Sequence, residues 1–197
     1  GVQIKKDKSG NYFVFGKGLG SLVAKKNIKL NFGNSGTLAR LLIGILSTTP
    51  DIEVRLSGDK SLNKRSMRKL INLMSEFGAR FLPDKKNTFP LKMISTEMPV
   101  GINYNAGVSA QLKSAVILAG LNSFGKTTIV ETKKSRDHTE NMLNNNTAAI
   151  KIKKGKVKTI EINGKKEIKS VNIKVPGDPS SAAFYTALTL LNKNSKL

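Results

Sequence analysis

The stretch IKLNFGNSGTLARLLIGILS, residues 28–47, decides the fold of this chain. It opens with a short β-rich run, continues through a turn rich in Gly, Asn and Ser, and ends in an almost uninterrupted apolar run. Glycine lets the backbone turn sharply, and a Ser or Thr before an apolar run is a typical helix start. The stretch therefore predicts a strand over residues 28–32, a turn over residues 33–37 and a helix over residues 38–47. Because that helix is apolar all round, we expect it to be buried.

The same strand–turn–helix pattern recurs four more times along the chain. The further strands are predicted over residues 52–56, 100–104, 127–131 and 171–175, with helices over residues 62–77, 110–121, 136–143 and 180–191. Thr37, Ser109 and Ser180 open the first, third and fifth helices and are 72 and 71 residues apart, while Ser61 and Ser135 are 74 apart. A fixed period of this length indicates a supersecondary unit that is used several times.

Each repeat ends in a predicted β-hairpin. One hairpin spans residues 81–94 and turns at residues 83–87, and the region 148–174 turns at residues 154–156 and again at Asn163-Gly164. The unit thus reads β-α-β-α-β-β, which predicts an α+β fold of repeated βαβαββ units with buried helices and outer sheets. The helix over residues 62–77 is amphipathic and is expected at the surface, whereas those opening at Thr37, Ser109 and Ser180 are expected inside.

The two ends of the chain suggest that it is a piece of a longer protein. It begins with Gly1 rather than Met and stops just after an apolar helical run. We expect residues 1–174 to form one domain of two βαβαββ repeats, incomplete at the N-terminus. Residues 175–197 are expected to begin a second, truncated domain.

The composition excludes several kinds of site. With no Cys and one His among 197 residues, disulfides, Cys-ligated zinc and multi-His metal sites are excluded, and a reducing compartment such as the cytoplasm is indicated. No apolar run approaches the length of a membrane span, so no membrane partner is expected. The formal net charge of +21 fits either a nucleic-acid surface or a cleft for small anions. Only 6% of the residues are aromatic and none is Trp, which argues against base stacking on nucleic acid.

The turns before the helices are candidate anion sites. A helix N-terminus attracts anions through its free N–H groups and its dipole. Any single hydroxyl residue there could be a plain helix cap, and His138 is read as a helix-start residue rather than a base. Several turns of this kind, however, predict a ligand with more than one acidic group. Basic or amide side chains follow the first four turns: Arg40; Lys60, Lys64 and Arg65; Gln111 and Lys113; Arg136 and His138.

Five motifs at these turns resemble those of the EPSP synthase family. They are Gly33-Asn34-Ser35-Gly36-Thr37, Gly58-Asp59-Lys60-Ser61-Leu62-Asn63-Lys64-Arg65-Ser66-Met67, Ser109-Ala110-Gln111-Leu112-Lys113-Ser114-Ala115, Ser135-Arg136-Asp137-His138-Thr139-Glu140-Asn141-Met142-Leu143 and Pro176-Gly177-Asp178-Pro179-Ser180-Ser181-Ala182-Ala183-Phe184. The motifs follow the family order over essentially the whole chain. The resemblance implies the inside-out α/β barrel of the enolpyruvyl transferases, with two domains of three βαβαββ units each.

The resemblance also implies a reaction. EPSP synthases move the enolpyruvyl group of phosphoenolpyruvate to the 5-hydroxyl of shikimate 3-phosphate, through a tetrahedral intermediate, and release phosphate in aromatic amino-acid (chorismate) biosynthesis. The expected partners are therefore these two anionic substrates, with glyphosate as an inhibitor of the parent enzyme because Gly36 has no side chain. No metal, no organic cofactor and no nucleic acid is expected, and the protein is expected to be a cytoplasmic monomer.

Individual roles follow from the matched motif positions. The phosphoenolpyruvate-binding residues are expected to be Asn34, Gly36, Arg65 and Gln111. The shikimate 3-phosphate-binding residues are expected to be Ser109, Ala110, Gln111, Ser135 and Arg136. Thr37 and Arg40 are expected to support the first loop.

Two departures from the family pattern limit the activity that we expect of this chain. Ser66 stands where the family usually has Pro after the Arg, which could loosen the loop holding Arg65. The family's opening Lys-Ser…Arg motif and its catalytic Asp, Glu and Lys have no match in this chain, so no catalytic residue is assigned and no turnover is expected. Three alternatives stay open: the UDP-N-acetylglucosamine enolpyruvyl transferase, which usually carries a loop Cys, a basic nucleic-acid-binding module, and a non-catalytic scaffold.

Overall fold

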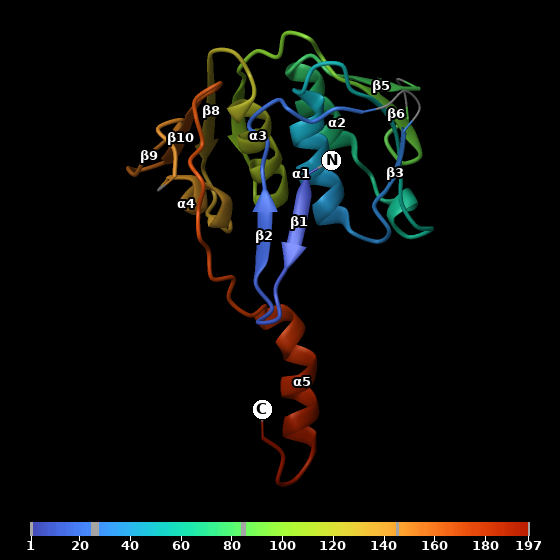
Figure 1. The fold of residues 1–197 in the computed structure, drawn as a ribbon, viewed down its shortest axis with the longest axis vertical. Helices are drawn as coiled ribbons and strands as arrows, with labels where there is room; N and C mark the ends of the chain where they lie inside the picture. Colours follow the sequence, from blue (N-terminus) through green and yellow to red (C-terminus); the bar gives the residue numbers. More distant parts are fainter. Residues whose placement is uncertain (1, 25–27, 84–85, 145, 197) are drawn as a thin grey trace.

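The two predicted repeats are present in the computed structural model, which describes residues 2–24, 28–83, 86–144 and 146–196 (Figure 1). The first repeat consists of β3 (Ile28–Asn31), α1 (Gly36–Ser47), β4 (Glu53–Ser57), α2 (Arg68–Glu76), β5 (Arg80–Leu82) and β6 (Leu91–Ile94). The second consists of β7 (Asn103–Ala106), α3 (Ala110–Leu121), β8 (Lys126–Glu131), α4 (His138–Asn144), β9 (Ile150–Lys153) and β10 (Lys158–Asn163). The predicted βαβαββ order is confirmed in both.

The two repeats also share one sheet topology. Their strand orders are β3-β4-β6-β5 and β7-β8-β10-β9, so corresponding strands occupy corresponding places. In each sheet the first two strands pair in parallel, and all later pairs are antiparallel. A parallel pair needs a crossover, which α1 and α3 supply. The internal repeat seen in the sequence is therefore a repeat in three dimensions.

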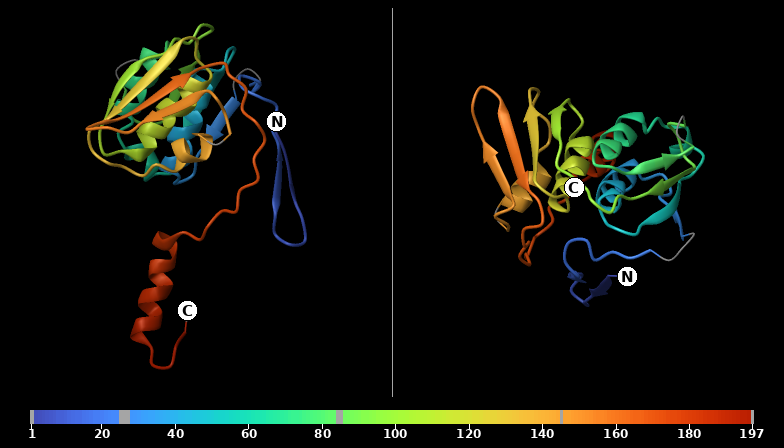
Figure 2. Two further views of the ribbon diagram at one scale, coloured as in Figure 1. Left: turned by 90° about the vertical axis from the view of Figure 1, so that its left-hand side faces the viewer. Right: turned by 90° about the horizontal axis from the view of Figure 1, so that it is seen from above.

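The sheets lie outside and the helices between them, as predicted (Figure 2). In β4 the residues alternate between exposed and buried, so one face of the strand points to the helices and the other to solvent. The two sheets do not close into a barrel within the described part of the chain. Their facing surfaces are filled by α1 and α3, which form the centre of the core.

Helices α1 and α3 run parallel and approach closely. Thr37 near the start of α1 bonds Gln111 near the start of α3, and Asn122 at the end of α3 donates to the carbonyl of Thr48 at the end of α1. Between these contacts Gly44 lies against the backbone of Ala115, where an added β-carbon would come within 2.6 Å of the Ala115 carbonyl oxygen. The apolar helices predicted to be inside are thus packed against each other.

The caps place the repeat in a slightly different register from the predicted one. The α1 cap is Ser35, whose Oγ accepts from the Leu38 N–H at 3.1 Å, and not Thr37. Ser109 caps α3 in the same way, through the Leu112 N–H at 3.3 Å. The structural period is therefore 74, the separation of Thr37 and Gln111, which hold the same position in their helices.

The second predicted helix, over residues 62–77, is broken into two pieces. Leu62–Lys64 form one 3-10 turn, Arg65 is extended with ψ 134°, and α2 starts only at Arg68. The break follows from a tertiary contact, because the Met67 N–H donates to the carbonyl of Asn87 at 2.7 Å instead of to a preceding turn. The predicted amphipathic character holds: α2 buries Leu70, Ile71, Leu73 and Met74.

The hairpins agree with the prediction in part. Strands β5 and β6 pair, and so do β9 and β10 across residues 154–157. The predicted turn at residues 83–87 includes positions 84–85, which lie outside the described residues. Asn163-Gly164 is not a hairpin turn, because the Lys165 N–H donates to the carbonyl of Leu121 and residues 165–178 form no strand.

The C-terminal region differs most from expectation. Residues 171–175 are not a strand, and α5 (Pro179–Leu191), expected to be buried, has no buried residue and points away from the sheets (Figure 1). An apolar helix is buried only where a complementary surface faces it, and no described element covers α5. Asp178 caps this helix, accepting from the Ser180 N–H at 3.0 Å.

An N-terminal hairpin was not predicted. Strands β1 (Gln3–Lys6) and β2 (Tyr12–Phe15) pair with each other, and both are exposed along their length. None of the described helices is long and apolar enough to cross a membrane.

Candidate functional site

Two guanidinium groups converge on the turn before α1. Arg40 Nη1 donates to the carbonyl of Gly36 at 3.0 Å, and Arg65 Nη2 donates to Asn34 Oδ1 at 3.2 Å. A β-carbon placed on Gly36 would lie 2.7 Å from Arg40 Nη1 and 3.4 Å from Arg65 Nη1. The first turn and the second turn, distant in sequence, therefore build one basic site around a residue with no side chain.

The third turn joins the same site through Gln111. Its side-chain oxygen accepts from Arg40 Nη1 at 3.0 Å, and its side-chain nitrogen donates to Thr37 Oγ1 at 2.7 Å. These bonds orient Arg40 from two sides and tie the start of α3 to the start of α1. The predicted support role of Thr37 and Arg40 is consistent with this geometry.

The electrostatics of the site favour an anion. Among the described residues, no carboxylate lies within 4.0 Å of Arg40 or Arg65. Burial lowers the pKa of Arg40, and the nearby charge of Arg65 lowers it further. Guanidinium groups bind carboxylate and phosphate through paired hydrogen bonds. Arg40 is half-buried and Arg65 is exposed, and an anion between them would stabilise both of these mutually repelling cations.

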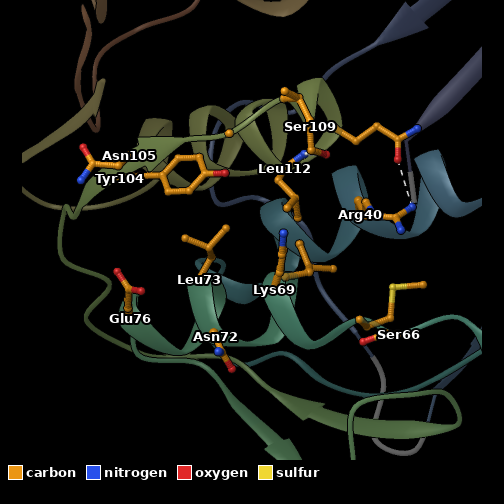
Figure 3. Close-up of a pocket in the computed structure, with 15 residues that line it drawn as sticks. Arg40, Ser66, Lys69, Asn72, Leu73, Glu76, Tyr104, Asn105, Ser109 and Leu112 are labelled. Atoms are coloured by element: carbon orange, nitrogen blue, oxygen red, sulfur yellow. Dashed lines mark hydrogen bonds between the residues drawn. The ribbon is translucent and has the colours of Figure 1, made fainter. Parts of the chain in front are cut away.

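A pocket of about 700 Å³ opens beside the third turn, between α2 and the start of α3 (Figure 3). Of the predicted residues, Arg40, Ser109 and Gln111 line it. Ala110 follows Ser109 as the first residue of α3 and is half-buried. The volume is typical of a small-molecule site. The α2 side chains that complete the wall, such as Lys69 and Asn72, were not singled out from the sequence.

The fourth turn carries Ser135 and Arg136, between β8 and α4. Ser135 is half-buried, and both its N–H and its O–H donate to Glu131 Oε1, at 3.0 and 2.7 Å. Arg136 is exposed. His138 is the first residue of α4 and is also exposed, which agrees with its reading as a helix-start residue. The fourth turn is connected to α3, which follows the third turn, because Glu131 accepts from Ser135 and also pairs with Lys113 of α3.

Lys113 is the residue whose place differs most from the sequence reading. It was grouped with the basic side chains of the third turn, but it is fully buried and pairs with Glu131 at 2.8 Å and Glu140 at 2.7 Å. Lys158 pairs with the same carboxylates, at 3.4 and 2.9 Å. We call these four residues the Lys113 cluster. A lysine inside an apolar helix was the available sign of a buried, paired charge.

Contacts within the Lys113 cluster shift the pKa values of Glu131 and Lys158. Burial alone would raise the pKa of Glu131, but hydrogen bonds from Lys113 and Ser135 outweigh it and lower the pKa to about 2. Burial opposes the charge of Lys158 as well, yet Glu140 and Glu131 raise its pKa. The charged forms of Glu131 and Lys158 are therefore both favoured in the folded protein.

Comparison with known proteins agrees with the motifs. Residues 1–196 match the family model described as EPSP synthase (3-phosphoshikimate 1-carboxyvinyltransferase). The chain is 40% identical over its whole length to a 3-phosphoshikimate 1-carboxyvinyltransferase of Paramagnetospirillum magneticum and 41% identical to one of Zymomonas mobilis. It spans 44% of the length of each of these curated relatives.

A solved structure gives the same result. The EPSP synthase from Acinetobacter baumannii superimposes with a TM-score of 0.79 at 36% identity, covering 96% of this chain and 42% of that one. Sequence motifs, duplicated topology and structural likeness agree along nearly the entire chain. The chain belongs to the EPSP synthase (3-phosphoshikimate 1-carboxyvinyltransferase) family.

Proposed function

We propose that this chain forms the shikimate 3-phosphate side of the active site of an EPSP synthase, the transferase that moves the enolpyruvyl group of phosphoenolpyruvate to the 5-hydroxyl of shikimate 3-phosphate. In this proposal Ser109, Ala110 and Gln111 bind shikimate 3-phosphate at the start of α3. Ser135 and Arg136 bind the same ligand from the fourth turn. Ser109 and Gln111 line the pocket beside α3, which supports their part of this assignment, whereas Ser135 and Arg136 are not among its lining residues.

Phosphoenolpyruvate is proposed to bind at the first turn, between Asn34, Gly36, Arg65 and Gln111. The observation that carries the proposal is the pair of guanidinium groups converging on Gly36 without a carboxylate partner in the described part of the chain. Phosphoenolpyruvate carries both a phosphate and a carboxylate, the two groups that Arg recognises best. Thr37 and Arg40 hold Gln111 and the turn in place.

The 197-residue chain is proposed to bind substrate weakly and not to turn over. The acid–base groups of the family have no match within it, and proton transfer needs such groups within hydrogen-bond reach of the substrate. Residues 1–174 are proposed as one domain and 175–197 as the start of a second. We also propose a cytoplasmic location, since phosphorylated substrates do not cross a bilayer unaided. A monomer without a cofactor is proposed from the resemblance to the family alone.

Glyphosate is proposed to inhibit the parent enzyme. The space at Gly36, bounded by Arg40 and Arg65, would admit an anionic inhibitor in place of phosphoenolpyruvate. Full activity of the parent enzyme at high glyphosate concentration would contradict this part of the proposal.

Calorimetric or NMR titration of shikimate 3-phosphate into the chain tests the binding proposal. Ser109→Ala and Arg136→Ala are each expected to weaken binding about tenfold, the effect of losing one charge-assisted hydrogen bond. Lys151→Ala is the matched control, because it removes one positive charge from an exposed position on β9. Equal loss in all three variants would indicate non-specific attraction to a basic protein.

Turnover is tested separately. Phosphate release from shikimate 3-phosphate and phosphoenolpyruvate is expected to stay at the level of a protein-free blank. Release above that level by the purified chain would overturn the proposal that its catalytic groups lie elsewhere.

A further inference from the structure

The Lys113 cluster connects the two turns that are proposed to bind shikimate 3-phosphate. The Lys113 backbone N–H donates to the carbonyl of Ser109 at 3.1 Å, one helical turn back, and its ammonium group reaches Glu131 at 2.8 Å. Glu131 ends β8 and accepts from Ser135 in the fourth turn. A continuous chain of bonds thus runs from Ser109 to Ser135 through the interior.

Glu131 takes up every hydrogen-bond donor that Ser135 has. A serine offers one backbone N–H and one hydroxyl hydrogen as donors, while the hydroxyl oxygen keeps lone pairs for accepting. Both donors end on Glu131 Oε1, at 3.0 and 2.7 Å. What Ser135 can present to a ligand is therefore only an acceptor.

We propose that Glu131 is a positioning residue of the shikimate 3-phosphate site, which orients the fourth turn so that Ser135 accepts from a ligand hydroxyl while Arg136 supplies the anion contact. This inference rests on the proposed function and deepens it, because it assigns different ligand groups to the neighbouring residues Ser135 and Arg136. Lys113 anchors Glu131 from α3, so the spacing between the third and fourth turns is set by a buried ion pair.

The reverse assignment, with Ser135 donating to the ligand phosphate, is electrostatically unfavourable. The hydroxyl hydrogen would have to leave Glu131, which would lose one of the bonds that keep its buried carboxylate ionised. A phosphate oxygen hydrogen-bonded to Ser135 Oγ would then lie within about 5 Å of the Glu131 carboxylate, and like charges at that distance repel. Arg136, exposed on the next position, has no such conflict.

Two substitutions separate positioning from mere structural support. Glu131→Gln and Glu140→Gln each remove one negative charge from the same cluster, and both positions pair with Lys113 and Lys158. Only Glu131 is bonded to Ser135 in the described structure. Glu140→Gln is therefore the matched control for charge and for stability.

The first readout needs no ligand. In the 197-residue chain, amide hydrogen exchange at Ser135, measured by NMR, is expected to rise about tenfold or more in Glu131→Gln and to stay near wild type in Glu140→Gln. Equal exchange at Ser135 in the two variants would overturn the inference, whatever the ligand results.

The second readout is ligand affinity. Shikimate 3-phosphate is expected to bind about tenfold more weakly to Glu131→Gln, with a change below about twofold in Glu140→Gln. If the wild-type chain does not bind shikimate 3-phosphate at all, the proposed function fails. If it binds, and the two Gln variants weaken binding equally, only the positioning role fails.

Ser135→Ala tests the acceptor assignment, and comparing two ligands in the same variant cancels any effect of the lost Ser135–Glu131 bond on stability. Because the lost contact is with a ligand hydroxyl, affinity for shikimate 3-phosphate and for unphosphorylated shikimate is expected to fall by the same factor. Arg136→Ala is expected to weaken only the phosphorylated ligand. A loss in Ser135→Ala confined to shikimate 3-phosphate would show that Ser135 serves the phosphate and would refute the proposal.

Discussion

Gly36→Ala is the substitution for which the structure makes the sharpest prediction. The new methyl group would lie 2.7 Å from Arg40 Nη1, closer than real β-carbons approach other atoms. That nitrogen is the far end of a flexible side chain, so it can swing aside while the backbone stays in place. In doing so it leaves both of its acceptors, the Gly36 carbonyl and Gln111 Oε1, each 3.0 Å away.

The size of the effect follows from two opposing terms. Hydrogen bonds from a charged donor contribute about 1.5–3 kcal/mol each, and the swing gives up at least one of them. Replacing Gly by Ala at a position with an ordinary helical backbone returns about 0.4–1 kcal/mol by restricting the unfolded chain. We expect Gly36→Ala to lower the free energy of unfolding by about 1–2 kcal/mol.

A double-mutant cycle in urea isolates the Arg40 contribution. In an Arg40→Met background the obstructing nitrogen is gone, so Gly36→Ala is expected to become stabilising, by about 0.4–1 kcal/mol. Gly16→Ala is the control, because a β-carbon there has no neighbour within 4 Å. A change of sign between the two backgrounds is the signature of the proposed contact.

The reasoning is refuted if Gly36→Ala has the same effect with and without the Arg40 guanidinium. Additive behaviour would mean that the methyl group acts on the backbone or on Leu62, whose Cδ1 lies 3.7 Å from the added β-carbon.

Three further predictions concern the cluster and the C-terminal helix. Since the folded pKa of Glu131 is about 2 against an ordinary 4.5, its stabilisation is fully present above pH 4.5 and is lost as the pH falls towards 2. The wild type should therefore exceed Glu131→Gln in unfolding free energy by about 3 kcal/mol at neutral pH, and the gap should close in acid; a gap constant with pH would contradict this. Lys113→Met leaves two buried carboxylates with one cation fewer and should lower the free energy of unfolding in urea by about 3–5 kcal/mol. Replacing Glu131 and Glu140 by Gln as well should recover part of this loss. Near-wild-type stability of Lys113→Met alone would show that the cluster does not stabilise the fold. Deletion of residues 175–197 should change the unfolding free energy of the rest by less than about 0.5 kcal/mol, because α5 has no buried residue, and a larger loss would place α5 against the core.

The fold was predictable because its signals are local and repeated. Strand, turn and helix follow one another twice in each repeat, and with the predicted hairpins this order gives a βαβαββ unit. The cap register was not predictable in the same way. Ser35 and Thr37 both carry hydroxyls in a Gly-rich turn, and only the extended backbone at Ser35, with ψ 91°, decides which of them caps α1.

Features that depend on contacts distant in sequence were missed. The helix over residues 62–77 has unbroken amphipathic periodicity, and its break depends on the carbonyl of Asn87. The apolar run in α5 predicted burial, but burial depends on what faces the helix.

In the candidate site, too, residues within local motifs were predictable, whereas their partners distant in sequence were not. Arg40, Arg65 and Gln111 were chosen from their motifs, and the structure brings them together around Gly36. The pairing of Lys113 with Glu131 and Glu140 was not foreseen, because residue types were visible while partners were not. Glu140 has a sufficient local role as an acidic residue in the first turn of α4, which concealed its part in the buried cluster.

Because α1 and α3 lie parallel, the free energy of unfolding should depend on which anions the buffer contains. Two helices side by side with their N-termini level place two positive dipole ends together, beside Arg40 and Arg65, in a chain of net charge +21. An anion that binds there only in the folded state stabilises it by RT ln(1 + [L]/Kd), about 1.4 kcal/mol at ten times its Kd. Phosphate or sulfate in a buffer would thus act as a folding ligand at the N-termini of α1 and α3.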